Sequence, residues 1–130
     1  MKYITGGHAL NIPCSLDTTG DWHSSSQDWE HPTIKESSCS FWGRNGIENH
    51  KGKFVANHIR ALLDYMLDGN MVATQGMRND YICNEAYTPF IFNMVYKMKN
   101  LPHWKKINRF MQAEYRLDWV KFLKEHENGR

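Results

Sequence analysis

The sequence lacks the long apolar runs, paired cysteines and glycine-rich loops that would assign it directly to a functional class. No apolar run approaches the ~20 residues of a membrane span, and no N-terminal stretch has the apolar core of a secretory signal. Three cysteines, Cys14, Cys39 and Cys83, are an odd number without C-x-x-C spacing, which argues against a disulfide framework. We therefore expect a cytoplasmic protein, without membrane contact, whose thiols are reduced.

Signatures of nucleotide binding, hydrolysis and metal binding are also missing. The glycines at 6–7 and 43–46 form neither a P-loop nor a dinucleotide fingerprint, and no Gly-x-Ser-x-Gly elbow occurs. No His-Glu-x-x-His or Cys-x-x-Cys spacing predicts a zinc site. The sequence therefore predicts no cofactor and no bound metal.

The chain has the size and composition of one ordinary globular domain. Its 130 residues are 41% hydrophobic and include five Trp, six Tyr and six Phe, and each enclosed ring buries about 150 to 250 Å². A chain of this length buries roughly two thirds of its unfolded surface, so it can form a core without metals or disulfides. We expect a single domain over residues 1–130.

The local patterns divide this domain into two parts, a strand- and loop-rich part at 1–50 and a helical part at 51–130. The first part predicts strands at 2–5 and 8–12 joined by a Gly-Gly turn, a short helix at 22–29 and a strand at 33–42. The second part predicts helices at 53–67, 70–77, 88–99 and 104–123.

Strands that precede helices, rather than alternating with them, favour an α+β fold. We expect a small N-terminal antiparallel sheet packed on three to five C-terminal helices. The apolar stripes of residues 54–67, 90–98 and 104–123, together with most methionines, are expected to form the core. His58 lies on the first of these stripes and is interpreted as a hydrogen-bonded core histidine. Arg60 and Asp64 have the spacing of a surface salt bridge on or near the opposite face, worth only tenths of a kcal/mol.

The loop-rich first part contains the residues best suited to catalysis. Asp21 and His23 are two positions apart, so in an extended chain both side chains point to one face and can act as a general acid/base pair. His8 can supply a third group, and a divalent metal is possible there. The alternative interpretation is that Asp21 caps the short helix. Cys14 with His8 or His23 is a candidate nucleophile and base, although burial as a small apolar group is the usual fate of a free cysteine.

Charge is unevenly divided along the chain. Residues 1–50 carry three basic and six acidic groups, a balance of −3, whereas residues 51–130 carry thirteen basic and eight acidic groups, a balance of +5. The basic groups concentrate at the junction of two predicted helices. We expect this surface to bind a partner through Lys97, Lys99, His103, Lys105, Lys106 and Arg109.

These observations predict a non-enzymatic protein-binding domain of the inhibitor, antitoxin or immunity type, because charge asymmetry speeds and orients association. Two alternatives stay open. One is a small hydrolase or nuclease that uses His8, Asp21 and His23. The other is a nucleic-acid-binding protein that uses the basic surface at 97–109.

Overall fold

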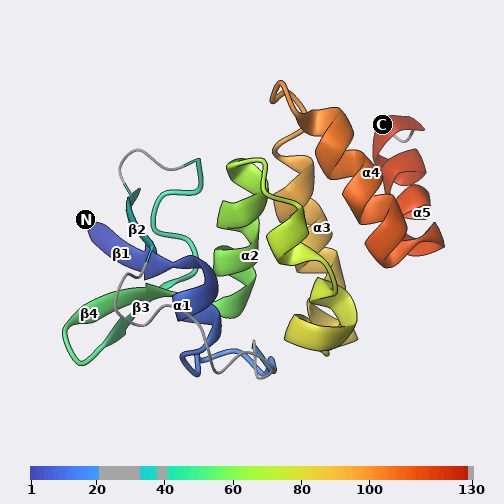
Figure 1. Ribbon diagram of the computed structural model, residues 1–130. Coiled ribbons are helices and arrows are strands. Elements are labelled where there is room, and N and C mark those ends of the chain that lie inside the picture. The colour runs from blue at the N-terminus through green and yellow to red at the C-terminus, as the bar shows by residue number, and fades with distance from the viewer. Residues whose placement is uncertain (21–32, 38–40, 129–130) are drawn as a thin grey trace.

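The computed structural model describes residues 1–20, 33–37 and 41–128 (Figure 1). Within them the chain forms four short strands, five α-helices and three shorter helical turns. In chain order these are β1 (Lys2–Thr5), α1 (Gly6–Leu10), β2 (Thr33–Glu36), β3 (Ile47–His50), β4 (Lys53–Ala56), α2 (His58–Leu67), η2 (Val72–Thr74), η3 (Met77–Ile82), η4 (Glu85–Tyr87), α3 (Thr88–Tyr96), α4 (Trp104–Tyr115) and α5 (Leu117–Asn128).

The four strands form one sheet in the order β2-β1-β4-β3. The pairs β1–β2 and β3–β4 are antiparallel, whereas β1 and β4 run parallel. The α+β prediction is therefore confirmed, but the sheet is mixed rather than antiparallel throughout as predicted. The parallel pair arises because β1 and β4 are far apart in sequence, and a strand that returns after a long connection is free to pair in either direction.

Helix α2 lies at the centre of the molecule, with the sheet on one side and α3, α4 and α5 on the other (Figure 1). Its residues Ile59, Leu62, Leu63 and Met66 are at most 2% exposed. Most apolar residues of the predicted core stripes are buried, as are the methionines, but Phe54 and Phe90 are 36% and 45% exposed. The core methionines are Met66, Met71, Met77, Met94, Met98 and Met111. No helix in the described ranges has the length and apolar character needed to cross a membrane.

One predicted element of the first part is wrong. The segment predicted as a strand at 8–12 contains the end of α1, which stops at Leu10. Gly6 has φ of +69°, so the chain leaves the extended conformation directly after β1. Ala9 and Leu10 are then buried. The Gly7 N–H donates to the Tyr65 hydroxyl at 2.7 Å, which fixes α1 against α2. The predicted helix at 22–29 and Cys39 lie outside the described residues.

The helix predicted at 53–67 begins five residues later. Lys51 and Gly52 both have positive φ, 52° and 88°, and form the two-residue turn that joins β3 to β4. Residues 53–56 are therefore a strand. Helix α2 starts after Asn57, whose side chain accepts the Arg60 N–H at 2.8 Å.

The stripe predicted as one helix at 104–123 is two helices, α4 and α5. The break is at Arg116, which has φ of +55°. This positive-φ conformation, with ψ of −127°, ends α4 and changes the direction of the chain, although the sequence there contains neither glycine nor proline. Leu117, the next residue, is 80% exposed.

Arg60 and Asp64 are buried, contrary to the prediction of a surface pair. Both side chains are 1% exposed, and Arg60 Nε donates to Asp64 Oδ1 at 2.9 Å. Asp64 Oδ2 also accepts from the hydroxyls of Tyr3 and Thr5 at 2.7 and 2.8 Å. The pair lies in the interior because β1 crosses α2 there, and its hydroxyls satisfy the carboxylate. This cluster ties the sheet to the helical layer.

Candidate functional site

Residues 11–20 form a loop that follows α1 and lies against the start of α2, held in place by side chains from other elements. The Ser15 N–H donates to both carboxylate oxygens of Glu48 at 3.1 Å. The Asp17 N–H donates to the Tyr87 hydroxyl at 2.9 Å. The Gly20 N–H donates to the Tyr81 carbonyl at 2.8 Å. These bonds give an irregular segment the fixed geometry that a chemical site requires.

Cys14, Thr18 and His58 form a hydrogen-bonded chain at this loop, which we call the thiol site. Cys14 Sγ lies 3.6 Å from Thr18 Oγ1, and Thr18 Oγ1 lies 2.7 Å from His58 Nδ1. Cys14 is half-buried, whereas His58 is 2% exposed. A nucleophile and a base are thus joined through one hydroxyl.

The other ring nitrogen of His58 determines which form the imidazole takes. Nε2 lies 2.8 Å from the carbonyl oxygen of Ile12, and a carbonyl can only accept a hydrogen bond, so Nε2 carries a proton. In the neutral ring Nδ1 is therefore the lone-pair nitrogen and accepts from Thr18. The nitrogen that can act as a base, Nδ1, therefore contacts the Thr18 hydroxyl, which in turn contacts the Cys14 thiol.

The electrostatics of the pair favour a thiolate and an imidazolium. Burial raises the pKa of the Cys14 thiol, but hydrogen bonds with His58, Thr18 and the Leu16 backbone outweigh it, and the pKa falls to about 7. Burial lowers the pKa of His58, and this effect is outweighed by hydrogen bonds with Cys14 and Ile12 and by the charges of Cys14 and Glu48, so the pKa is raised. Each group thus stabilises the charged form of the other.

Glu48 and His50, on β3, form a second polar pair next to the loop. His50 Nε2 lies 3.1 Å from Glu48 Oε1. Burial raises the pKa of Glu48, but hydrogen bonds from Ser15 and the hydrogen bond and charge of His50 outweigh this effect, so the pKa is lowered and the carboxylate is charged. This negative charge both holds Ser15 and favours the protonated form of His58.

Gly20 closes the thiol site against His58. Its φ is +73°, and a Cβ added there would lie 2.7 Å from His58 Cε1 and 2.5 Å from the Leu10 carbonyl oxygen. A larger residue would displace the imidazole. Glycine is therefore required here both for its conformation and for space.

Of the three catalytic residues predicted from the sequence, the structure describes His8 alone. His8 is half-buried on α1. Asp21 and His23 lie outside the described residues. The prediction that the cysteines are buried is wrong for Cys83, which is exposed and whose Sγ donates to the Asn79 carbonyl at 2.9 Å. The π-helical turn η3 ends there and leaves the side chain outside the core.

The residues predicted to form a basic binding surface have different roles. His103 Nε2 donates to the Met66 carbonyl at 3.0 Å and Lys106 Nζ to the Gly69 carbonyl at 2.7 Å. Both therefore tie the start of α4 to the C-terminal end of α2, where positive charge is favourable. The Lys99 ammonium lies 4.5 Å from the centre of the Tyr96 ring.

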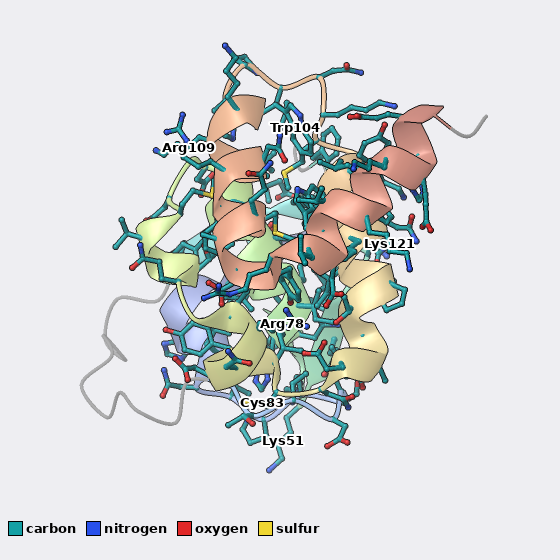
Figure 2. All side chains as sticks on the ribbon, turned by 90° about the vertical axis from the view of Figure 1, so that its right-hand side faces the viewer. Lys51, Arg78, Cys83, Trp104, Arg109 and Lys121 are labelled. Carbon is teal, nitrogen blue, oxygen red and sulfur yellow. The ribbon has the colours of Figure 1, made fainter. Side chains whose placement is uncertain are left out.

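The remaining members of this set, Lys97, Lys105 and Arg109, are exposed. None of them forms an ion pair with a residue that the structure describes. Figure 2 shows the Arg109 side chain pointing outward from α4. These cations are available to a partner.

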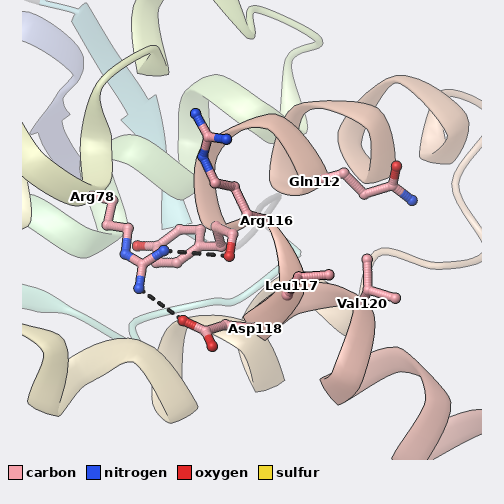
Figure 3. A pocket seen from close by; sticks show the side chains of 7 residues that line it. Arg78, Gln112, Arg116, Leu117, Asp118 and Val120 are labelled. Carbon is pink, nitrogen blue, oxygen red and sulfur yellow. Dashed lines mark hydrogen bonds and ion pairs between the residues drawn. The ribbon is translucent and has the colours of Figure 1, made fainter.

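A hollow at the turn between α4 and α5 is also lined by charged residues (Figure 3). The Arg78 guanidinium there donates to Glu85, to Asp118 and to the Tyr115 carbonyl. Burial, with the nearby negative charges of Glu85 and Glu114, holds the pKa of Tyr115 above its ordinary range. Since Arg78 is paired with Glu85 and Asp118 and Tyr115 stays protonated, we assign these groups of the hollow a structural role.

Sequence reasoning missed His58 as the partner of Cys14. Part of the placement of His58 has a local signal. If Lys51-Gly52 is recognised as a hairpin turn, the helix starts after Asn57, and His58 lies in its first turn. The proximity of residues 14 and 58 has no local signal. Among the described ranges, no group of three or more His, Cys, Asp or Glu residues is arranged to hold a metal ion.

No protein-family model matches the sequence, and no curated protein and no solved structure is significantly similar to it. The thiol site is therefore the feature of the protein that indicates a function.

Proposed function

We propose that the protein is a thiol-dependent enzyme that transfers or hydrolyses acyl groups, with Cys14 as nucleophile and His58 as its acid and base. The observation that supports this is the chain Cys14–Thr18–His58, in which a half-buried thiol with a pKa of about 7 is linked to a buried histidine. At neutral pH about half of such a thiol is thiolate, against about one percent for an ordinary pKa of 9.0.

The reaction begins with the Cys14 proton on His58. The thiolate sulfur attacks the carbonyl carbon of an ester or thioester and forms a carbon–sulfur bond. The bond to the leaving group then breaks, and the leaving group takes the proton from His58 Nδ1 through the Thr18 hydroxyl. Water next attacks the acyl-enzyme, His58 accepts its proton, and the carbon–sulfur bond breaks to release the acid. No oxidant or reductant is needed.

Thr18 and Glu48 act as positioning residues in this proposal. The Thr18 hydroxyl can donate to one neighbour while it accepts from the other, so it carries a proton between Cys14 and His58. Glu48 fixes the residue after the nucleophile and supplies negative charge that favours protonated His58. Both functions are expected to affect rate more than substrate affinity.

The test is pre-steady-state hydrolysis of p-nitrophenyl acetate, with the acetyl group located by peptide mass spectrometry. We expect a burst of about one product per chain and an acetyl group on Cys14. Cys14→Ser should abolish the burst, whereas the matched control Cys83→Ser should retain it. Acetylation confined to lysines, or a burst that Cys14→Ser leaves intact, would overturn the proposal.

A further inference from the structure

An open groove runs beside α4, on the face that this helix turns towards η2. Its lining includes Met71, Lys106, Arg109, Phe110, Ala113 and Glu114. On α4 these positions recur at intervals of three and four, so they form one continuous stripe about two turns long. We call this feature the α4 groove.

The α4 groove combines an apolar floor with cationic walls. Met71 and Phe110, 7% and 8% exposed, form the floor, and Ala113 is exposed beside them. Lys106 and Arg109 are exposed. Val72, adjacent in sequence to Met71, is 75% exposed. An apolar surface bordered by cations is suited to a partner that presents an apolar side chain next to carboxylates.

The groove is held in shape without a partner. Lys106 Nζ donates to the Gly69 carbonyl, which fixes one end of the groove. At the other end, Glu114 accepts from the backbone N–H groups of Gly76 and Arg78 at 3.2 and 3.1 Å. Lys106 and Glu114 are thus each held by backbone partners, whereas Arg109 forms no ion pair with a residue that the structure describes and can pair with a ligand. A preformed groove lowers the entropic cost of binding.

We infer that the α4 groove binds an acidic segment of a partner protein, with one apolar side chain on Met71 and Phe110 and a carboxylate on Arg109. A second copy of this chain is disfavoured, because Glu114, the carboxylate of the groove itself, is already held by the Gly76 and Arg78 N–H groups. Nucleic acid is disfavoured by the apolar floor of Met71 and Phe110, since phosphate binding requires a continuous basic surface. This inference is independent of the thiol site.

The test uses two synthetic peptides of equal length that share one central leucine, flanked by glutamates in one and by lysines in the other. Binding is followed by backbone amide NMR and by fluorescence anisotropy. We expect the glutamate peptide to bind at least tenfold more tightly than the lysine peptide. Its amide shifts should be concentrated at Met71, Phe110 and Ala113.

Two groove variants and one matched control locate the site. Arg109→Glu and Ala113→Glu should each weaken the glutamate peptide about tenfold. Lys121→Glu makes the same charge change on α5, on the other side of the α4–α5 pair (Figure 2), and should change affinity less than twofold. Circular dichroism confirms that each variant is folded.

Four outcomes would overturn the inference. Equal affinity for both peptides, or an equal loss in Lys121→Glu, would show attraction by net charge alone. Tighter binding of a single-stranded oligonucleotide that Arg109→Glu abolishes would indicate a nucleic-acid surface. A dimer in light scattering that Ala113→Glu dissociates would indicate self-association.

Discussion

Replacing His58 by glutamine should change the pH dependence of Cys14 reactivity in a specific way. Glutamine can still donate to the Ile12 carbonyl, as Nε2 of His58 does at 2.8 Å, but it cannot take a proton from the thiol. The Cys14 pKa should then return from about 7 towards its ordinary value of 9.0. The assay is the rate of alkylation by iodoacetamide in a background where Cys39 and Cys83 are serine.

The size of the effect follows from two opposing factors. At pH 6 a thiol with a pKa of about 7 is roughly ninety times more ionised than one at 9.0. A thiolate of lower pKa is also a weaker nucleophile, by a factor of about 8 for this difference. The wild-type protein should therefore react about tenfold faster than His58→Gln at pH 6.

The two rate profiles should cross near pH 8, because above it both thiols ionise and the variant thiolate is the better nucleophile. At pH 10 the variant should be several-fold faster. Thr18→Val should shift the profile in the same direction, and Thr18→Ser should restore it. Parallel profiles that never cross, with Cys14 titrating near 9 in both proteins, would refute the thiolate–imidazolium pair.

Three further predictions concern stability, measured by urea unfolding. Asp64→Asn should cost about 3 to 5 kcal/mol, because it leaves the buried Arg60 guanidinium without its charge partner; a cost below 1 kcal/mol would contradict this. Arg116→Gly should stabilise the fold by about 1 kcal/mol by relieving the positive φ, and destabilisation would indicate no strain there. Glu48→Gln should cost about 1 kcal/mol at pH 7. That loss should vanish progressively below pH 4.5, where the wild-type carboxylate, whose pKa is lowered, also becomes protonated; a cost independent of pH would contradict it.

The parts of the fold predicted correctly have strong local signals. The strand at 2–5 and the helix that begins with Thr88-Pro89 match β1 and α3, since proline in the first turn is specific to helix starts. The buried methionines follow helical spacing. In each case the local pattern and the tertiary contacts favour the same conformation.

The errors occurred where a tertiary contact overrides a local pattern. The apolar residues at 54 and 55 fit a helical stripe equally well, but pairing with β1 and β3 makes them part of β4. Arg116 breaks a continuous stripe with no residue that would normally do so. Asp64 is buried because hydroxyls from β1 meet it, which the helix sequence alone does not encode.

The thiol site was half predicted. Cys14 was identified as a candidate nucleophile, but its expected partners were His8 or His23, because only residues near it in sequence were considered. His58 lies 44 positions away and reaches the loop because α2 packs against α1. A contact between distant segments of this kind depends on the whole fold.

The pairing of Cys14 with His58 is tested most sharply by measuring the pKa of His58 by NMR of its ring nitrogens, with Cys14 intact and with Cys14→Ala. If the two groups form one pair, the His58 pKa should fall in the variant, because the hydrogen bond and negative charge of Cys14 that raise it are gone. Its Nε2 should stay protonated in both proteins, on the Ile12 carbonyl. An unchanged His58 pKa would mean that the thiol and the imidazole titrate independently and would contradict the central claim.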